Sequence, residues 1–180
     1  IVRDLEHMLR RLLGADIAAP AIERARDRCR TFDHVSFQQL DMRRDRIPGR
    51  FELIVCSEVL YYIGNRFALA RFARKVAAAL EPGGHLLTAH AHAVVDDPTA
   101  TGFDWQVGFG GKHIGEAFAR VPGMELVREL RTPVYRIQLF RRSTGPTPRR
   151  QLPRELFEQQ TADVGDLASA INWRGCAVTR

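Results

Sequence analysis

The chain has 180 residues, of which 45% are hydrophobic and 27% charged, and this balance suits one globular domain with a buried core. Its net charge of +6 comes almost entirely from arginines interleaved with acidic residues, so the sequence does not indicate nucleic-acid binding. Its three cysteines show neither metal-ligand spacing nor even pairing, and it has no signal peptide or apolar span of about 20 residues, so we expect a cytoplasmic protein without bound metal or membrane contact.

Segments with apolar residues at helical spacing alternate along the chain with short apolar runs, and this alternation is typical of an α/β protein. Pro20 and Asn65 mark helix starts, because proline is tolerated in a first helical turn and asparagine caps helices well. The Pro-Gly-Gly at 82–84 ends a helix. In chain order, the sequence predicts a helix over 5–12, a strand over 12–17, a helix over 20–30, strands over 35–40 and 51–56, a helix over 65–80 and a strand over 85–90.

The remaining sequence predicts the end of one domain and a tail. A glycine-rich loop over 102–111 and a short helix over 113–120 precede two strands, over 124–131 and 134–142. Only a few residues separate these strands, which favours an antiparallel hairpin at the sheet edge. We therefore expect a domain over 1–142, followed by a linker and tail over 143–180 of unknown structure.

Acidic residues follow two of the predicted strands. Asp16 ends one strand directly before a helix, where a carboxylate can accept hydrogen bonds from both hydroxyls of a bound ribose. Alternatively, Asp16 only caps the helix that follows. Asp41 ends the next strand, and the alternative for it is a solvated loop beside Arg43 and Arg44.

Four segments, over 12–17, 21–26, 35–41 and 51–63, together resemble class I S-adenosylmethionine-dependent methyltransferases, most closely the NodS-like family. The resemblance covers about 5–142. It implies a Rossmann-like three-layer sandwich, with a mostly parallel sheet and a C-terminal antiparallel hairpin. It also implies S-adenosylmethionine as cofactor and methyl transfer to an N or O atom of a small-molecule acceptor, for which a saccharide derivative is one candidate.

The resemblance assigns cofactor contacts to three strand ends. Asp16 and Ile17 would bind the ribose side, Asp41 would accept from the adenine amino group, and Met42 would flank the ring. Cys56, Ser57 and Glu58 would line the methionine part, unless Ser57 and Glu58 simply begin a turn.

The acceptor side is expected near aromatic and histidine residues. A methyl sulfonium is attracted to aromatic faces, so Tyr61 and Tyr62 could form one wall of the transfer site. The alternative is that these tyrosines are core residues. Methyl transfer to an amine needs in-line positioning and a group that takes a proton. Candidate acceptor contacts are Tyr61, Tyr62, His90, Trp105 and His113, and candidate catalytic residues are Glu58, His90 and His113.

One expected part is missing, because the family's first strand and glycine-rich turn should precede the 5–12 helix. The leading explanation is that the chain is a fragment of a longer enzyme. Alternatively, it is a degenerate, non-catalytic adenosine-binding module, or the missing element comes from elsewhere, such as the Gly-Cys-Ala of 175–177. A nicotinamide-dependent oxidoreductase would share Asp16, but Asp41 and the terminal hairpin disfavour it.

Overall fold

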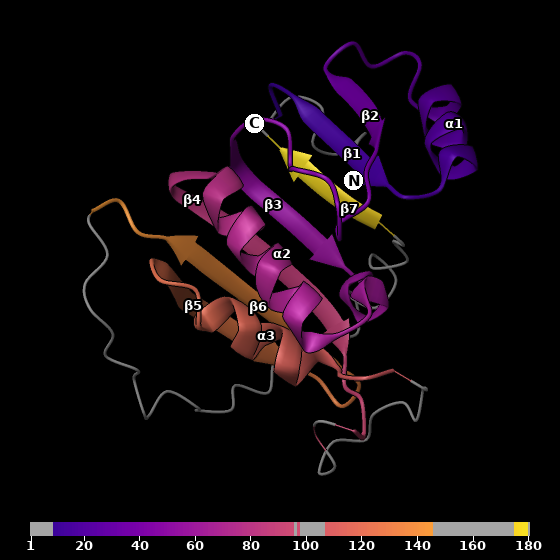
Figure 1. Cartoon of the computed structure of the whole chain (residues 1–180). Helices are drawn as coiled ribbons and strands as arrows, with labels where there is room; N and C mark the ends of the chain where they lie inside the picture. Colours follow the sequence, from indigo (N-terminus) through magenta and orange to yellow (C-terminus); the bar gives the residue numbers. More distant parts are fainter. Residues whose placement is uncertain (1–8, 96, 98–106, 146–174, 180) are drawn as a thin grey trace.

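A seven-stranded sheet in the order β2-β1-β7-β3-β4-β6-β5 forms the centre of the computed structural model (Figure 1). The structure describes residues 9–95, 97, 107–145 and 175–179. The strands are β1 (Leu12–Asp16), β2 (Val35–Gln39), β3 (Phe51–Ser57), β4 (Leu80–Ala91), β5 (Met124–Arg131), β6 (Tyr135–Arg142) and β7 (Gly175–Thr179). The helices are α1 (Ala19–Arg28), the 3-10 helix η1 (Leu60–Ile63), α2 (Arg66–Ala79) and α3 (Gly111–Ala119).

The strand directions confirm the expected mixed sheet. β1 pairs with β2 in parallel, as β3 does with β4, whereas β6 runs antiparallel to both β4 and β5. The predicted hairpin over 124–142 is therefore present. The boundary of β4 differs from the prediction, because Leu80 already pairs with Phe51 and the strand continues through the Pro-Gly-Gly at 82–84.

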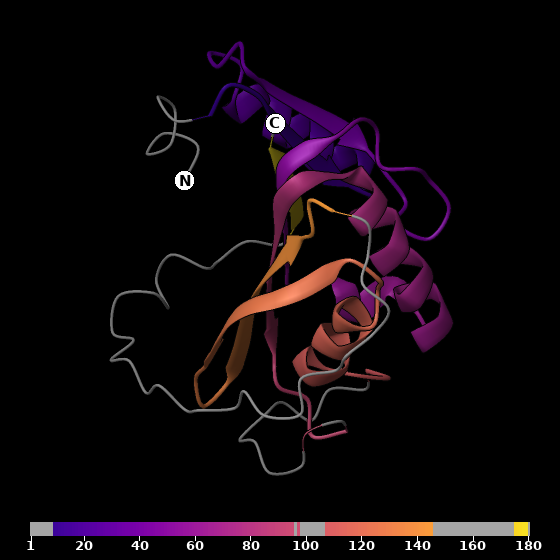
Figure 2. The same ribbon diagram turned by 90° about the vertical axis from the view of Figure 1, so that its left-hand side faces the viewer.

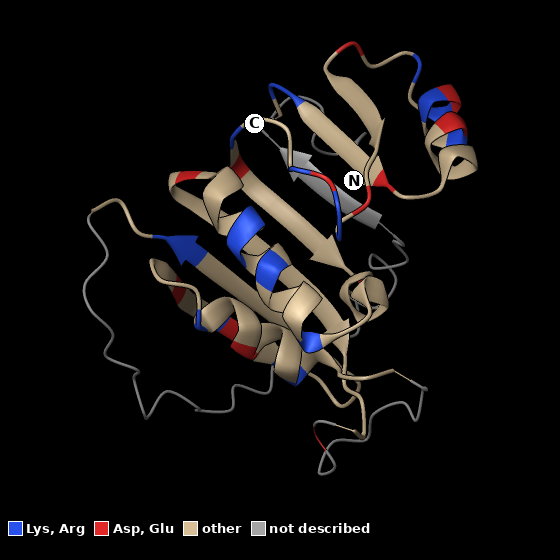
Figure 3. Ribbon diagram, viewed as in Figure 1, with Lys and Arg blue, Asp and Glu red and all other residues tan. Residues whose placement is uncertain are grey.

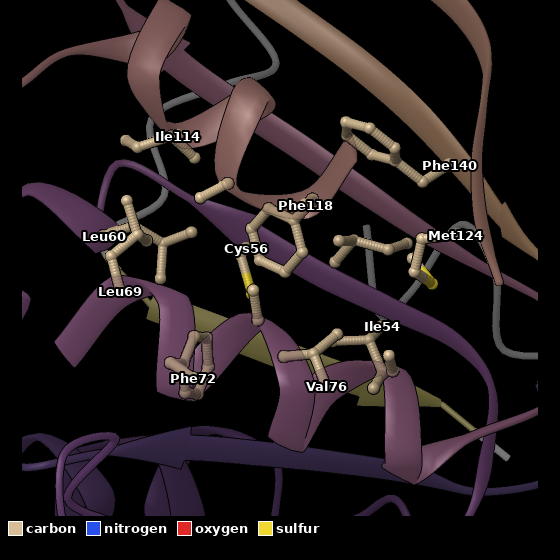
Figure 4. Packing of buried hydrophobic residues seen from close by; sticks show 14 of the residues in the cluster. Ile54, Cys56, Leu60, Leu69, Phe72, Val76, Ile114, Phe118, Met124 and Phe140 are labelled. Atoms are coloured by element: carbon tan, nitrogen blue, oxygen red, sulfur yellow. The ribbon is translucent and has the colours of Figure 1, made fainter. Parts of the chain in front are cut away.

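The main core lies between β3, β4 and β6 and two helices, α2 and α3. Asn65 begins α2, and its Oδ1 accepts a hydrogen bond from the Ala68 amide at 2.9 Å. Both helices lie on one side of the sheet (Figure 2). None of the described helices is both long and apolar enough to cross a membrane. Large apolar side chains from all these elements meet in this core, including Ile54, Leu60, Leu69, Phe72, Val76, Ile114, Phe118 and Phe140 (Figure 4).

The segment of β1, α1 and β2, here called the N-terminal unit, has a smaller core of its own. Helix α1 packs against β1 and β2 and buries only Ile22. Leu12 and Leu40 are also buried but do not join the main cluster. Half of the predicted helix over 5–12 lies outside the described residues, and the prediction is wrong for the other half, because residues 9–12 are not helical and Leu12 already begins β1. The N-terminal unit therefore depends on the rest of the sheet for its position.

Strand β7 occupies the middle of the sheet. It lies between β1 and β3 and runs antiparallel to both, with Ala177 opposite Gly14 on one side and Val55 on the other. The sheet is thus continuous where the sequence predicts a missing strand. The tail expected over 143–180 includes this strand, which contains the Gly-Cys-Ala of 175–177 that the sequence offers as one source of the missing element. Because β7 is antiparallel, it is not a permuted copy of a parallel first strand.

Candidate functional site

Three strands bring the predicted cofactor residues to one edge of the sheet. The carboxyl ends of β1, β2, β3 and β4, here called the ligand edge, lie together because these strands are parallel within their pairs and β7 joins the pairs. Asp16 ends β1, and the Leu40 amide donates to the Asp16 carbonyl at 2.9 Å, which places Asp41 on the adjacent strand end. Ser57 ends β3 opposite Gly175. Open α/β sheets bind ligands at this kind of edge.

Asp16 stabilises the turn before α1, and its predicted contact with ribose stays a prediction. Its Oδ1 accepts a hydrogen bond from the Ala18 amide at 2.8 Å, directly before α1. Its Oδ2 has no hydrogen-bond partner among the described residues, and the side chain is half-buried. The neighbouring Ile17 is 62% exposed. One carboxylate oxygen thus holds the helix start, and the other remains available to a ligand.

Asp41 organises the loop that follows β2. Its Oδ1 accepts from the Arg43 amide at 2.8 Å, and its own amide donates to Asp45 Oδ2 at 2.8 Å. Arg44 Nε lies 3.7 Å from Asp41 Oδ2 on an exposed side, a geometry that contributes little stability in water. Asp41 therefore sits at the ligand edge in a fixed turn. Its predicted contact with adenine stays a prediction.

A lysine on α2 fastens the same loop. Lys75 Nζ donates to the carbonyls of Met42, Arg43 and Asp45 at 3.2, 3.3 and 2.6 Å. Arg71 Nη2 adds a bond to the Arg43 carbonyl at 2.9 Å. Helix α2 carries basic residues and no acidic ones, and they mark its outer side in Figure 3. These bonds hold the Met42 loop against α2.

The end of β3 carries a buried polar atom without a hydrogen-bond partner among the described residues. Cys56 is fully buried, and its thiol points into the core towards α2 (Figure 4), so any ligand contact by this residue falls to its backbone. Ser57 is 6% exposed, and its buried Oγ has no hydrogen-bond partner in the described part of the chain. A buried unpaired hydroxyl is costly, by about 1–3 kcal/mol. A polar ligand at the edge could remove this cost.

Glu58 connects three strands and η1 just beyond the end of β3. It has a left-handed backbone with φ of 55°, and its amide donates to the Ala89 carbonyl at 3.0 Å. Its Oε1 accepts from the Tyr61 hydroxyl at 2.8 Å and from the Ala91 amide at 3.1 Å. The Tyr135 side chain on β6 also lies near this carboxylate. Burial raises the pKa of Glu58, and these hydrogen bonds oppose the shift.

The structure places His90 beneath this cluster. The side chain is 1% exposed, its Nε2 accepts from the Leu60 amide at 3.3 Å, and its ring meets Tyr61 edge-on at 5.1 Å. Burial lowers the pKa of His90 to about 3, so the ring is neutral. Its contacts are those of a core residue that supports Tyr61, and its predicted role in acceptor binding stays a prediction.

The other predicted acceptor residues are spread over different environments. Tyr61 is buried, whereas Tyr62 is 72% exposed beside it. His113 lies on α3, where its ring packs near Phe109 and its Nδ1 is 3.7 Å from Glu116 Oε2. Trp105 lies outside the described residues. Glu58 and Tyr61 are thus the acceptor-side candidates that the structure brings into direct contact.

Sequence reasoning missed Lys75 and Tyr135, and it offered Gly175 only within the Gly-Cys-Ala of 175–177 as one possible source of the missing element. Lys75 is one cationic residue among several on α2, and only the packing of the 41–45 loop distinguishes it. Tyr135 joins Glu58 because β6 pairs with β4, opposite Ala91. Gly175 reaches the edge through long-range strand pairing. None of these placements has a local sequence signal.

A separate pocket lies at the opposite end of the strands. Its walls include Leu12, Ser36 and Phe51, which begin or nearly begin β1, β2 and β3. This pocket is therefore not part of the ligand edge.

Comparison with known proteins identifies the family. The sequence profile described as "Nodulation protein S (NodS)" matches residues 2–98, more than half of the chain. Nodulation protein S of Rhizobium fredii is 32% identical over 78 residues, which are 43% of this chain and 45% of that protein. The Rhizobium tropici protein is 35% identical over 77 residues, 43% of this chain and 32% of that protein. The matched region thus spans less than half the length of these relatives.

Solved structures agree on the fold. The N-methyltransferase NodS from Bradyrhizobium japonicum WM9, in complex with S-adenosyl-L-homocysteine, superposes with a TM-score of 0.62 at 24% identity, over 73% of this chain and 66% of that one. An S-adenosylmethionine-dependent methyltransferase from Clostridium acetobutylicum ATCC 824 gives a TM-score of 0.61 at 11% identity, over 79% of each chain. The chain therefore belongs to the NodS family and has the Rossmann-like α/β fold of class I methyltransferases.

Proposed function

We propose that this chain is an S-adenosylmethionine-dependent methyltransferase that transfers a methyl group to nitrogen on a small-molecule acceptor. The observation that carries the proposal is the ligand edge itself. An available carboxylate oxygen of Asp16 and the unpaired Oγ of Ser57 lie at strand ends on either side of Gly175. The N-methyltransferase activity named for the Bradyrhizobium NodS structure supports nitrogen over oxygen.

The residues of the edge fit an adenosyl ligand. The free Oδ2 of Asp16 would accept from ribose hydroxyls, and hydrogen bonds to a charged group contribute about 1.5–3 kcal/mol each. Asp41 and Met42 would face the adenine from a loop that Lys75 already fixes. Ser57 Oγ would donate to the amino-acid part. When bound, S-adenosylmethionine supplies a methyl group on a cationic sulfur.

Glu58 is the proposed proton acceptor. An ammonium group has no lone pair, so it must lose a proton before it can accept a methyl group, and a nearby base can take that proton. Burial raises the pKa of Glu58 and so makes the carboxylate a better base than an exposed one. Tyr61 and Ala91 hold Oε1, which fixes the direction of the carboxylate. Glu58 can thus receive the proton without losing its orientation.

Calorimetric titration of the full chain with S-adenosylhomocysteine tests the cofactor site without knowledge of the acceptor. We expect binding, and we expect Asp16→Ala to weaken it about tenfold or more, equivalent to about 1.4 kcal/mol. Asp16→Asn keeps an oxygen for the Ala18 amide and separates loss of charge from loss of the helix start. Asp33→Ala, at an exposed turn away from the edge, is the matched control. Absence of binding by the folded chain would refute the proposal.

The acceptor class needs a second experiment. Transfer of a labelled methyl group should be measured against amino sugars and against the same sugars with the amine acetylated. Nitrogen transfer predicts label on the free amines alone, since acetylation removes the nucleophilic lone pair. Label on both sets would point to an oxygen acceptor instead.

A further inference from the structure

Helix α2 turns a line of cations and one aromatic side chain away from the core. Phe67, Arg71 and Arg74 share one side of the helix at a spacing of three or four residues, Arg66 lies beside them, and all four are exposed. The basic residues of α2 mark its outer side in Figure 3. Phe67 is 86% exposed, more than any other large hydrophobic side chain in the described part of the chain. Packing within the described residues therefore does not account for this phenylalanine.

The cations on this side of α2 are not compensated by acidic residues. Helix α2 contains no acidic residue, and no carboxylate among the described residues forms an ion pair with Arg66, Arg71 or Arg74. The Arg71 guanidinium and the Lys75 ammonium donate to backbone carbonyls of the 42–45 loop, which carry no net charge. These bonds fix the two side chains without neutralising them. The helix therefore presents a positive surface that attracts anionic groups.

The 41–45 loop adds a further cation where α2 begins. A Cβ at Gly64, between η1 and α2, would lie 3.8 Å from Arg43 Cζ, so the Arg43 guanidinium lies beside this turn. Arg71 Nη2 donates to the Arg43 carbonyl at 2.9 Å and holds the loop in place. The exposed surface that results, here called the basic face, consists of Arg43, Arg66, Phe67, Arg71 and Arg74.

We propose that the basic face docks onto a membrane surface rich in anionic phospholipids. The negative headgroups complement the arginines, and each arginine close to such a surface strengthens binding about fivefold. Phe67 enters the boundary between headgroups and acyl chains, where its ring leaves water. The sequence predicts no membrane contact because it has no long apolar span, but docking of this kind requires none.

Phe67 distinguishes a bilayer from a nucleic acid as the partner. Phosphates of either one would pair with the arginines. On a nucleic-acid duplex the phenylalanine would face a charged, hydrated backbone, whereas in a bilayer it is buried among apolar atoms. Proteins that bind single strands through aromatic side chains place several of them along a basic groove. The basic face has one aromatic residue on the outer side of a helix, which favours the bilayer.

Cosedimentation of the full chain with lipid vesicles tests the proposal. We expect binding to vesicles of equal parts phosphatidylglycerol and phosphatidylcholine, and none to phosphatidylcholine alone. The pair Arg66→Gln and Arg74→Gln should weaken binding about 25-fold, which is about fivefold for each charge. The control pair Arg24→Gln and Arg28→Gln, at exposed positions of α1, removes the same charge and should change binding little. Equal losses in both pairs would overturn the proposal, since net charge alone would then account for the binding.

Phe67→Ser tests the apolar contact separately. It leaves every charge in place and removes a side chain that lies outside the core, so the variant should fold as the wild type does. Its binding to the mixed vesicles should be about tenfold weaker. Raising the salt concentration to about 1 M, where the Debye length is about 3 Å, should release the wild type from the vesicles. Unchanged binding of Phe67→Ser would overturn docking onto a bilayer.

A DNA duplex of random sequence serves as the competing partner. Absence of vesicle binding would overturn the proposal. Binding of the duplex that the Arg66→Gln and Arg74→Gln pair removes, without vesicle binding, would assign the basic face to nucleic acid instead. Docking does not depend on methyl transfer, and Phe67→Ser should bind S-adenosylhomocysteine as the wild type does. Failure of the proposed function and failure of the docking surface are therefore seen in separate measurements.

Discussion

The Tyr61 hydroxyl donates to Glu58 Oε1 at 2.8 Å, and this bond ties η1 to the end of β3. The same oxygen accepts from the Ala91 amide at the end of β4. Glu58 follows β3 in a left-handed conformation, which only a small fraction of non-glycine residues adopt. A strained backbone held by several hydrogen bonds is typical of a functional position.

Glu58→Gln should change the pH dependence of stability. Burial raises the pKa of Glu58 above its ordinary value of 4.5, so the folded state binds the proton more tightly than the unfolded chain. The stability that proton binding by Glu58 gives to the folded state is complete below pH 4.5 and is lost as the pH rises through the raised pKa. The free energy of unfolding of the wild type, from urea titrations, should therefore fall relative to Glu58→Gln between pH 4 and pH 8. Parallel pH profiles would contradict this assignment.

His90→Gln should act in the opposite direction. Burial lowers the pKa of His90 from 6.5 to about 3, so its stabilisation is present above pH 6.5 and is lost as pH falls towards 3. The wild type should thus lose stability faster than the variant on acidification below pH 6.5. His85→Gln, on the same strand but only half-buried, is the control. If both variants have the wild-type acid profile, His90 is not responsible.

Lys75→Met should loosen the loop that carries Met42. The substitution keeps the aliphatic stem but removes the ammonium that donates to three loop carbonyls. Hydrogen exchange at 41–45 should be about tenfold faster, since charge-assisted bonds contribute about 1.5–3 kcal/mol. Binding of S-adenosylhomocysteine should weaken as well. Arg74→Met, at the neighbouring exposed position, should change neither quantity.

Gly115→Ala should destabilise the packing of α3 on β6. A Cβ at this position would lie 2.1 Å from Gln138 Oε1, and Gln138 is only 4% exposed. The Gln138 amide also donates to Glu129 Oε2 at 2.6 Å, so the side chain cannot move without losing a bond. We expect a loss of about 1–3 kcal/mol in unfolding free energy. Gly108→Ala, where a Cβ meets no atom within 4 Å, should have little effect.

Local pattern was sufficient for much of the architecture. Short apolar runs and helical spacing predicted β1, β3, α1 and α2 to within a few residues, and the short separation of β5 and β6 predicted their hairpin. The start of β4 was predicted five residues too late, because pairing of Leu80 with Phe51 overrides the breaking tendency of the Pro-Gly-Gly.

The sequence by itself determined which residues stand at strand ends, since Asp16, Asp41 and Ser57 directly follow or close recognisable strands. Only the tertiary structure decided that β7 completes the sheet, that Tyr135 reaches Glu58, that Lys75 holds the Met42 loop and that His90 is buried under Tyr61. The physical reason is the sequence separation between the residues that interact. Strand and helix patterns depend on neighbouring residues, whereas these four relationships depend on pairing and packing between segments far apart in the chain.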